Sequence, residues 1–268
     1  MAAQLTILGT GNAAVTRCYN TCFAIRTAAS VFLTDAGGGN GILPRLEQAG
    51  IALSEIREIF VTHTHTDHIL GVIWVVRMVA QEMNKGAAEG TLRLFGHAEA
   101  MAVTEWMCRH TLPGKITALF GSRILFCPLE DGGSFDAAGM EGVAFDIGST
   151  KTQQFGYRLC LPDGQVLVCL GDEPFNESTR PYVEGADWLL SEAFCLYADR
   201  ERFRPYEKHH STALDAGRLA AELKVRRLLL YHTEDKTLAT RRAAYTAEAA
   251  AAFAGEIFVP EDGEVLAL

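Results

Sequence analysis

The stretch Phe60-Val61-Thr62-His63-Thr64-His65-Thr66-Asp67-His68 places four potential metal ligands within one short segment. The apolar residues that open it have the β-branched and aromatic character of a buried strand, so the imidazoles are predicted to emerge where that strand ends. In α/β folds the chemistry is found at such strand ends. His63 and His65 can point the same way from extended backbone, while Asp67 and His68 begin the next turn and can face a second ion. One loop could therefore serve two metals.

The clustering of histidines in this stretch has no evident folding benefit. It holds three of the eight histidines of the chain, with an aspartate among them. Imidazoles that become protonated side by side repel one another. A metal-binding motif explains the pattern better than three packed or surface histidines do, and its structural context is the test of this interpretation.

Length and composition favour one globular domain spanning residues 1–268. The chain has 268 residues and 49% hydrophobic content, enough to bury a sizeable core. A net charge of −9 argues against a protein whose main role is sequence-blind binding to nucleic acid, although a local basic patch would still permit it. Seven cysteines without paired spacing predict free thiols in a reducing cytoplasm. We expect no signal peptide, and the apolar run 69–78 is too short to span a membrane.

The His-x-His-x-Asp-His motif, with Thr62 ahead of it and Leu70-Gly71 behind, resembles the signature of the metallo-β-lactamase superfamily. The wider segment 56–71 is similar to the branch that contains ribonuclease Z and small phosphodiesterases. This resemblance implies an α/β fold, an αββα sandwich of two mixed β-sheets flanked by helices. It also implies that Asp35, at the end of the strand pair 20–35, supports the metal loop by hydrogen bonding without ligating.

Two later positions match the family's remaining ligands. Asp172 follows the strand-like run 166–170 and corresponds to the metal-bridging carboxylate. His232 follows the run 227–231 and corresponds to the last ligand of the second metal. The resemblance thus assigns His63 and His65 to a first site. It assigns Asp67, His68, Asp172 and His232 to a second, better furnished site.

One position departs from the family pattern. Counting back from Phe155-Gly156-Tyr157 places Thr150 where a third histidine of the first site belongs, and no histidine lies between His110 and His209. A neutral hydroxyl is a poor ligand for zinc. We expect a weakened first site, or one completed by water or another side chain. Asp146 and a fixed charge from Lys151 are alternatives that the sequence leaves open.

The segment His209-His210-Ser211-Thr212 follows a basic run and resembles the His-Ser-Thr motif of ribonuclease Z, in which the histidine contacts the reacting phosphate. His210, not His209, is the candidate. With Asp67 orienting a metal-activated water, His210 would protonate or stabilise the leaving oxygen. A capped surface helix remains the alternative for this segment.

These observations predict a metal-dependent hydrolase of phosphodiester bonds in a small nucleotide-like substrate. One or two zinc ions are expected, with manganese or iron as alternatives. Hydrolysis of a thioester or lactone, and a degenerate metal-binding protein without activity, are the other hypotheses. The short turn at 162–164 leaves no room for the arm that bacterial ribonuclease Z uses to grip transfer RNA, which argues against transfer-RNA 3′ processing. Trp74, on an apolar helix, would suit a homodimer face.

Overall fold

In the computed structural model, which describes residues 3–268, fourteen strands form two sheets of seven. The first sheet has the order β14-β1-β2-β3-β4-β5-β6 and the second the order β13-β12-β11-β10-β9-β8-β7. The strands of the first sheet are β1 (Gln4–Gly9), β2 (Cys22–Arg26), β3 (Val31–Thr34), β4 (Ile56–Phe60), β5 (Leu92–His97), β6 (Ile124–Leu129) and β14 (Val265–Ala267). Those of the second are β7 (Ser134–Ala137), β8 (Met140–Asp146), β9 (Phe155–Cys160), β10 (Val166–Cys169), β11 (Trp188–Glu192), β12 (Arg227–Tyr231) and β13 (Glu256–Phe258).

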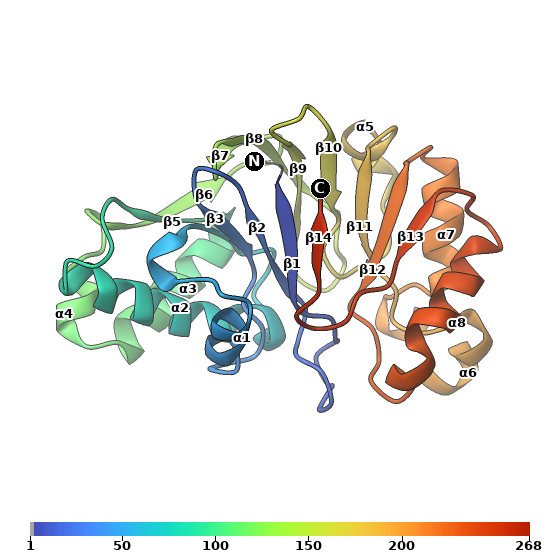
Figure 1. Cartoon of the computed structure of the whole chain (residues 1–268), viewed down its shortest axis with the longest axis horizontal. Coiled ribbons are helices and arrows are strands. Elements are labelled where there is room, and N and C mark those ends of the chain that lie inside the picture. The colour runs from blue at the N-terminus through green and yellow to red at the C-terminus, as the bar shows by residue number, and fades with distance from the viewer. Residues whose placement is uncertain (1–2) are drawn as a thin grey trace.

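Helices cover the outer faces of both sheets (Figure 1). The helices on the first sheet are α1 (Ile42–Gln48), α2 (Thr66–Asn84), α3 (Ala98–Thr111) and α4 (Gly114–Thr117). The helices of the other half are α5 (Arg180–Val183), α6 (Arg200–Phe203), α7 (Ala213–Glu222) and α8 (Leu238–Ala250). Both sheets are mixed, because strands 3 to 6 and strands 10 to 13 run parallel while the others pair antiparallel. The predicted αββα sandwich is confirmed.

Three apolar layers explain this architecture. Alternating strand residues such as Phe32, Phe60 and Tyr157 pack between the two sheets, with the ring centroids of Phe60 and Tyr157 4.9 Å apart. The opposite faces of the strands pack against α2 on one side and against the Ala-rich faces of α7 and α8 on the other. Both sheets are therefore buried on two faces, as parallel strands with helical crossovers require.

Two features of the fold lie outside the local sequence pattern. The last strand of the described residues, β14, pairs with β1 at the edge of the first sheet. Helix α2 begins at Thr66, ahead of the apolar run 69–78, which places Asp67 and His68 in its first turn. A carboxylate there is favoured by the helix dipole. No helix within residues 3–268 combines the length and apolar character needed to cross a bilayer.

Trp74 lies on the outer part of α2 and is 37% exposed. Together with Leu70, Ile73 and Met107 it lines an apolar hollow of about 310 Å³ between α2 and α3. The sequence alternatives for this residue were a core helix, a pocket floor or a dimer face. The structure places it at a surface hollow, and homodimerisation through this face stays a prediction.

Candidate metal centre

The histidine-rich loop lies where β4 ends and α2 begins. Its two first imidazoles face each other, with His63 Nε2 and His65 Nδ1 2.9 Å apart. His63 is fully buried and His65 partly so. Two ring nitrogens at this distance present their lone pairs to a common point, because extended backbone sends alternate side chains to the same side. The loop therefore brings the two ring nitrogens close enough to serve one ion, and their role as metal ligands stays a prediction.

The later carboxylate and histidine come to the same place from the other sheet. Asp172 follows β10 and His232 follows β12, both at the carboxyl ends of their strands. The Oδ2 atom of Asp172 lies 3.6 Å from Nε2 of His63 and 3.6 Å from Nε2 of His232. Nε2 of His232 is also 3.5 Å from a carboxylate oxygen of Asp67. Residues more than 100 positions apart thus converge on one buried centre.

The donors form overlapping groups that could each hold an ion. They are His63, His65 and Asp172; Asp67, His68 and His232; and Asp172, His210 and His232. Within each group one donor atom from every residue lies within 4.8 Å of the others. Asp172 is common to the first and third groups. It is therefore placed to bridge two metal positions.

Buried donor atoms that lack partners test whether this centre fits a metal. Nε2 of His68, Nε2 of His232 and Oδ1 of Asp172 are buried without a hydrogen-bond partner in the described part of the chain. Leaving such atoms unpaired is costly, and native proteins rarely do so. Nitrogen and carboxylate donors without thiolate suit zinc, manganese or iron. The residues present fit a metal centre.

Asp35 supports the loop from below, and its predicted hydrogen-bonding role is confirmed. One carboxylate oxygen accepts from the backbone N–H of Thr62 at 2.9 Å, and the other accepts from the Thr62 hydroxyl at 2.7 Å. Nδ1 of His68 lies 2.8 Å from the second oxygen. A hydrogen on Nδ1 leaves the Nε2 lone pair free for an ion.

The electrostatics of the centre keep its carboxylates ionised. Burial alone would raise the pKa of Asp67, but His68 and His232 hold the pKa of that carboxyl well below its usual range. The pKa of Asp172 is likewise low, because nearby imidazoles outweigh its burial. Burial lowers the pKa of His63 well below its ordinary value. Anionic carboxylates beside a neutral imidazole are the forms that bind a cation.

His210 lies beside this centre with a carboxylate that the sequence did not single out. Its Nδ1 lies 3.6 Å from Oε2 of Glu192, the buried last residue of β11. The His210 ring stacks on the Phe194 ring, with their centroids 4.9 Å apart. The ammonium nitrogen of Lys208 lies 4.7 Å from the centroid of the same Phe194 ring. The sequence signal that could have indicated Glu192 is its charge at the end of an apolar strand. Asp172 follows an apolar strand in a similar way. The His210 ring therefore lies between the Phe194 ring and the buried Glu192 carboxylate.

The arginines expected beside His210 make other contacts. The Arg202 guanidinium lies over the ring of Phe203, and Arg204 pairs with Glu207 at 3.5 Å. Both arginines are exposed. Lys208, in contrast, contacts the Phe194 ring on which His210 stacks.

Thr150 makes a contact in place of the expected third histidine. Its hydroxyl Oγ1 lies 3.2 Å from Nδ1 of His209, and both residues are exposed. The sequence alternatives are engaged elsewhere. Asp146 accepts from Gly148 N and Gln153 Nε2, and Lys151 Nζ lies 3.6 Å from Glu173.

The first site nevertheless has three protein donors, His63, His65 and Asp172. Three protein ligands and an open position are typical of catalytic zinc sites. The loss of the third histidine therefore leaves a donor set that still suits catalysis.

His97 is buried at the end of β5 and caps α3. Its Nδ1 accepts from the backbone N–H of Ala100 at 3.3 Å. Among the residues described, it joins none of the three donor groups. Its position as the buried N-cap of α3 explains this histidine without a metal.

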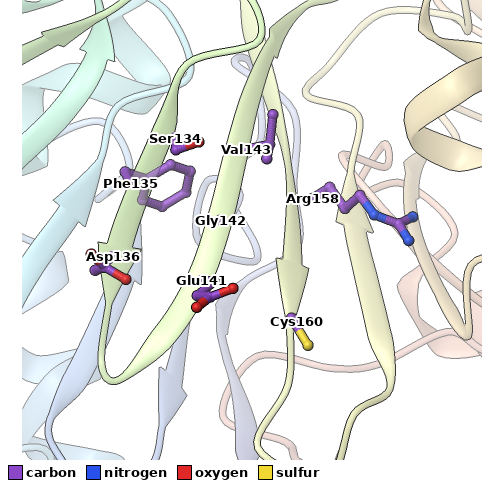
Figure 2. A pocket seen from close by; sticks show the side chains of 8 residues that line it. All are labelled: Ser134, Phe135, Asp136, Glu141, Gly142, Val143, Arg158 and Cys160. Carbon is purple, nitrogen blue, oxygen red and sulfur yellow. The ribbon is translucent and has the colours of Figure 1, made fainter.

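A separate hollow of about 410 Å³ lies on β7, β8 and β9 (Figure 2). Its charged lining consists of Asp136, Glu141 and Arg158, and the guanidinium of Arg158 donates to the Tyr182 carbonyl at 2.9 Å. None of the histidines lines it. This hollow is therefore separate from the three donor groups of the described residues.

Comparison with protein families identifies the chain. The family model described as Anti-Pycsar protein Apyc1 matches residues 3–250. The chain belongs to this family. A curated relative of this Apyc1-family chain, Ribonuclease Z of Thermobifida fusca (strain YX), is 28% identical over 97% of the chain and 92% of the relative.

Solved structures share the fold of the Apyc1-family chain. The metallo-β-lactamase fold protein YhfI from Bacillus subtilis superposes with a TM-score of 0.79 at 20% identity, covering 99% of each chain. A diphosphatase from the PhnP family superposes with a TM-score of 0.74 at 18% identity, covering 100% of this chain and 98% of that one. The predicted metallo-β-lactamase superfamily and its ribonuclease Z-like branch are confirmed.

Proposed function

We propose that this protein is a metal-dependent hydrolase that cleaves a phosphodiester bond in a small nucleotide-like substrate. The observation that carries the proposal is the pair of overlapping donor groups that share Asp172. A curated relative named Ribonuclease Z and a structural neighbour titled a diphosphatase support phosphorus–oxygen bond cleavage. The net charge of −9 favours a small substrate over a long polyanion.

Six residues would hold the metal. They are His63, His65, Asp67, His68, Asp172 and His232. One or two zinc ions, or manganese or iron, would supply Lewis-acid chemistry and activate water for attack on phosphorus.

The chain's own groups would do the rest of the chemistry. Asp67 is ionised beside His68 and His232, so it can accept a hydrogen bond from the attacking water and orient it. His210, whose Nδ1 lies 3.6 Å from a carboxylate oxygen of Glu192, would donate a proton or a hydrogen bond to the leaving oxygen. The carboxylate of Glu192 favours a hydrogen on the Nδ1 atom that faces it. Protonation of the ring would then leave the hydrogen on Nε2 available for transfer.

The proposal is tested by hydrolysis of bis-p-nitrophenyl phosphate with added zinc or manganese. His232→Ala should lose turnover, whereas the matched control His110→Ala, at an exposed histidine on α3, should resemble the parent. Absence of turnover by the parent would refute the phosphodiesterase assignment, as would a His232→Ala variant as active as the parent.

Parallel substrates and metal analysis separate the alternatives. Turnover of a thioester or lactone without turnover of diesters would favour the other ester chemistry. Cleavage of a transfer-RNA precursor in preference to small diesters would favour the activity in the curated relatives' name. Two ions per purified chain support an enzyme, and none would support a non-catalytic protein.

A further inference from the structure

We propose that His209, which contacts Thr150, is a second imidazole that binds the phosphate group of the substrate beside the metal centre. This inference deepens the proposed function and rests on it. The contact that carries it joins Thr150 Oγ1 to His209 Nδ1 at 3.2 Å across 59 positions of sequence. It connects the loop before β9 with the loop before α7.

In each loop, a residue next to the Thr150–His209 pair connects the loop to the metal centre. The Ser149 hydroxyl donates to Oε1 of Glu173 at 2.9 Å, and Glu173 directly follows Asp172. On the other loop, His210 belongs to a donor group with Asp172 and His232. Each member of the Thr150–His209 pair is therefore one residue away from a group anchored at the centre. The pair lies beside the donors and not among them.

The backbone at His209 separates two consecutive imidazoles. Its φ of 55° and ψ of 50° are left-handed, a conformation that few non-glycine residues adopt. His210 is 7% exposed, against Phe194 and Glu192, whereas His209 is exposed toward Thr150. One histidine thus reaches the buried centre while its neighbour stays open to a solute.

The chemistry of the pair suits an anion. When the Thr150 hydroxyl donates to Nδ1, the hydrogen of the neutral ring is on Nε2, which is then a donor for a phosphate oxygen. Lysines flank both members: Lys151 follows Thr150, and Lys208 precedes His209. Lys151 Nζ is 3.6 Å from Glu173, and Lys208 lies over Phe194. A lysine next to each member of the pair, together with an N–H donor on Nε2, favours a phosphoryl group.

The test compares His209→Ala and Thr150→Val with the matched control His110→Ala. For bis-p-nitrophenyl phosphate, His209→Ala should raise KM about 10-fold or more, because a hydrogen bond to a charged group is lost. Its kcat should change less than about 2-fold, as expected for binding lost equally from ground and transition states. Thr150→Val should raise KM by a smaller factor. Thr150→Ser, which keeps the hydroxyl, should have the KM of the parent. Metal content should stay at the parent value in every variant.

Three results would overturn the inference. A KM for His209→Ala equal to that of the control would show that the ring does not contact substrate. Loss of an ion from His209→Ala would show that it is a ligand instead. If the parent cleaves no diester, the proposed function fails, and calorimetry with inorganic phosphate still decides the role of His209. Weaker phosphate binding by His209→Ala than by the control supports that role, whereas equal binding, or none by the parent, overturns it.

Discussion

The hydrogen bonds to Asp35 predict a large and specific effect of the substitution Asp35→Asn. The carboxylate accepts from Thr62 N, Thr62 Oγ1 and His68 Nδ1, and it is buried. Its φ of 51° is left-handed, which asparagine tolerates well. The variant therefore changes the acceptor without straining the backbone. An amide oxygen can keep the bond to Thr62 N, and the Thr62 hydroxyl can turn to accept from the amide nitrogen. The same nitrogen cannot accept the hydrogen on His68 Nδ1, so that bond is lost.

The expected magnitude follows from the bond between the carboxylate and His68 that is lost. A hydrogen bond to a charged group contributes about 1.5–3 kcal/mol, so the free energy of unfolding should fall by about that amount. Without the carboxylate, the hydrogen on His68 is no longer fixed to Nδ1, and Nε2 is less available as a ligand. Removing such a partner typically weakens metal binding by about 10- to 100-fold.

Urea denaturation of metal-free protein and zinc titration against a competing chelator measure these two effects separately. Asp146→Asn is a useful control, because Asp146 is also bonded to neighbours but lies outside the donor groups of the described chain. Its zinc affinity should match that of the parent. An Asp35→Asn variant that binds zinc as tightly as the parent would refute the assignment of His68 as a ligand oriented by Asp35.

Three further predictions concern packing, pH and catalysis. A Cβ at Gly71 would lie 1.8 Å from the Ala36 carbonyl oxygen, so Gly71→Ala should cost about 3 kcal/mol of unfolding free energy in urea. Burial lowers the pKa of His97, so the unfolded chain binds the proton first and stability should fall as the pH drops below about 6.5. His97→Asn, which keeps a capping oxygen, should make the melting temperature depend less on pH in this range. An unchanged dependence of the melting temperature on pH would contradict this prediction. Glu192→Gln should lower kcat about 10- to 100-fold for a diester with an alkoxide leaving group. It should change kcat little for a p-nitrophenyl ester, because p-nitrophenolate leaves without protonation. Equal losses of kcat for the two substrates would exclude a role in leaving-group protonation.

Local pattern was sufficient for much of the fold. Strand β12 coincides with the predicted run 227–231, because apolar residues between polar borders define a buried strand. Helix α2 begins ahead of the apolar run 69–78. Thr66, Asp67 and His68 carry no apolar periodicity, but the helix dipole favours the aspartate in the first turn. The pairing of β14 with β1 depends on contacts between the two ends of the chain, which periodicity does not report.

The candidate site shows the same division. The resemblance to the family selects Asp172 and His232, and each follows an apolar strand of a sheet whose parallel strands end at one edge. Glu192 ends an apolar strand in a similar way. The sequence does not predict its role, because a lone glutamate at a strand end matches no motif. The contact between Thr150 and His209 depends on how two distant loops meet. Such a contact cannot be read from either segment alone.

The position of the metal centre also connects the two sheets. His63 and His65 follow a strand of the first sheet, and Asp172 and His232 follow strands of the second. Backbone bonds already join the halves at this edge, from Phe155 N to the Thr62 carbonyl at 3.0 Å and from Thr233 N to the Thr10 carbonyl at 3.0 Å. An ion bound by both sets of donors binds only the assembled sandwich, so its binding free energy adds to the stability of the whole fold. Substitutions between the sheets should therefore weaken metal binding even when they lie far from any ligand.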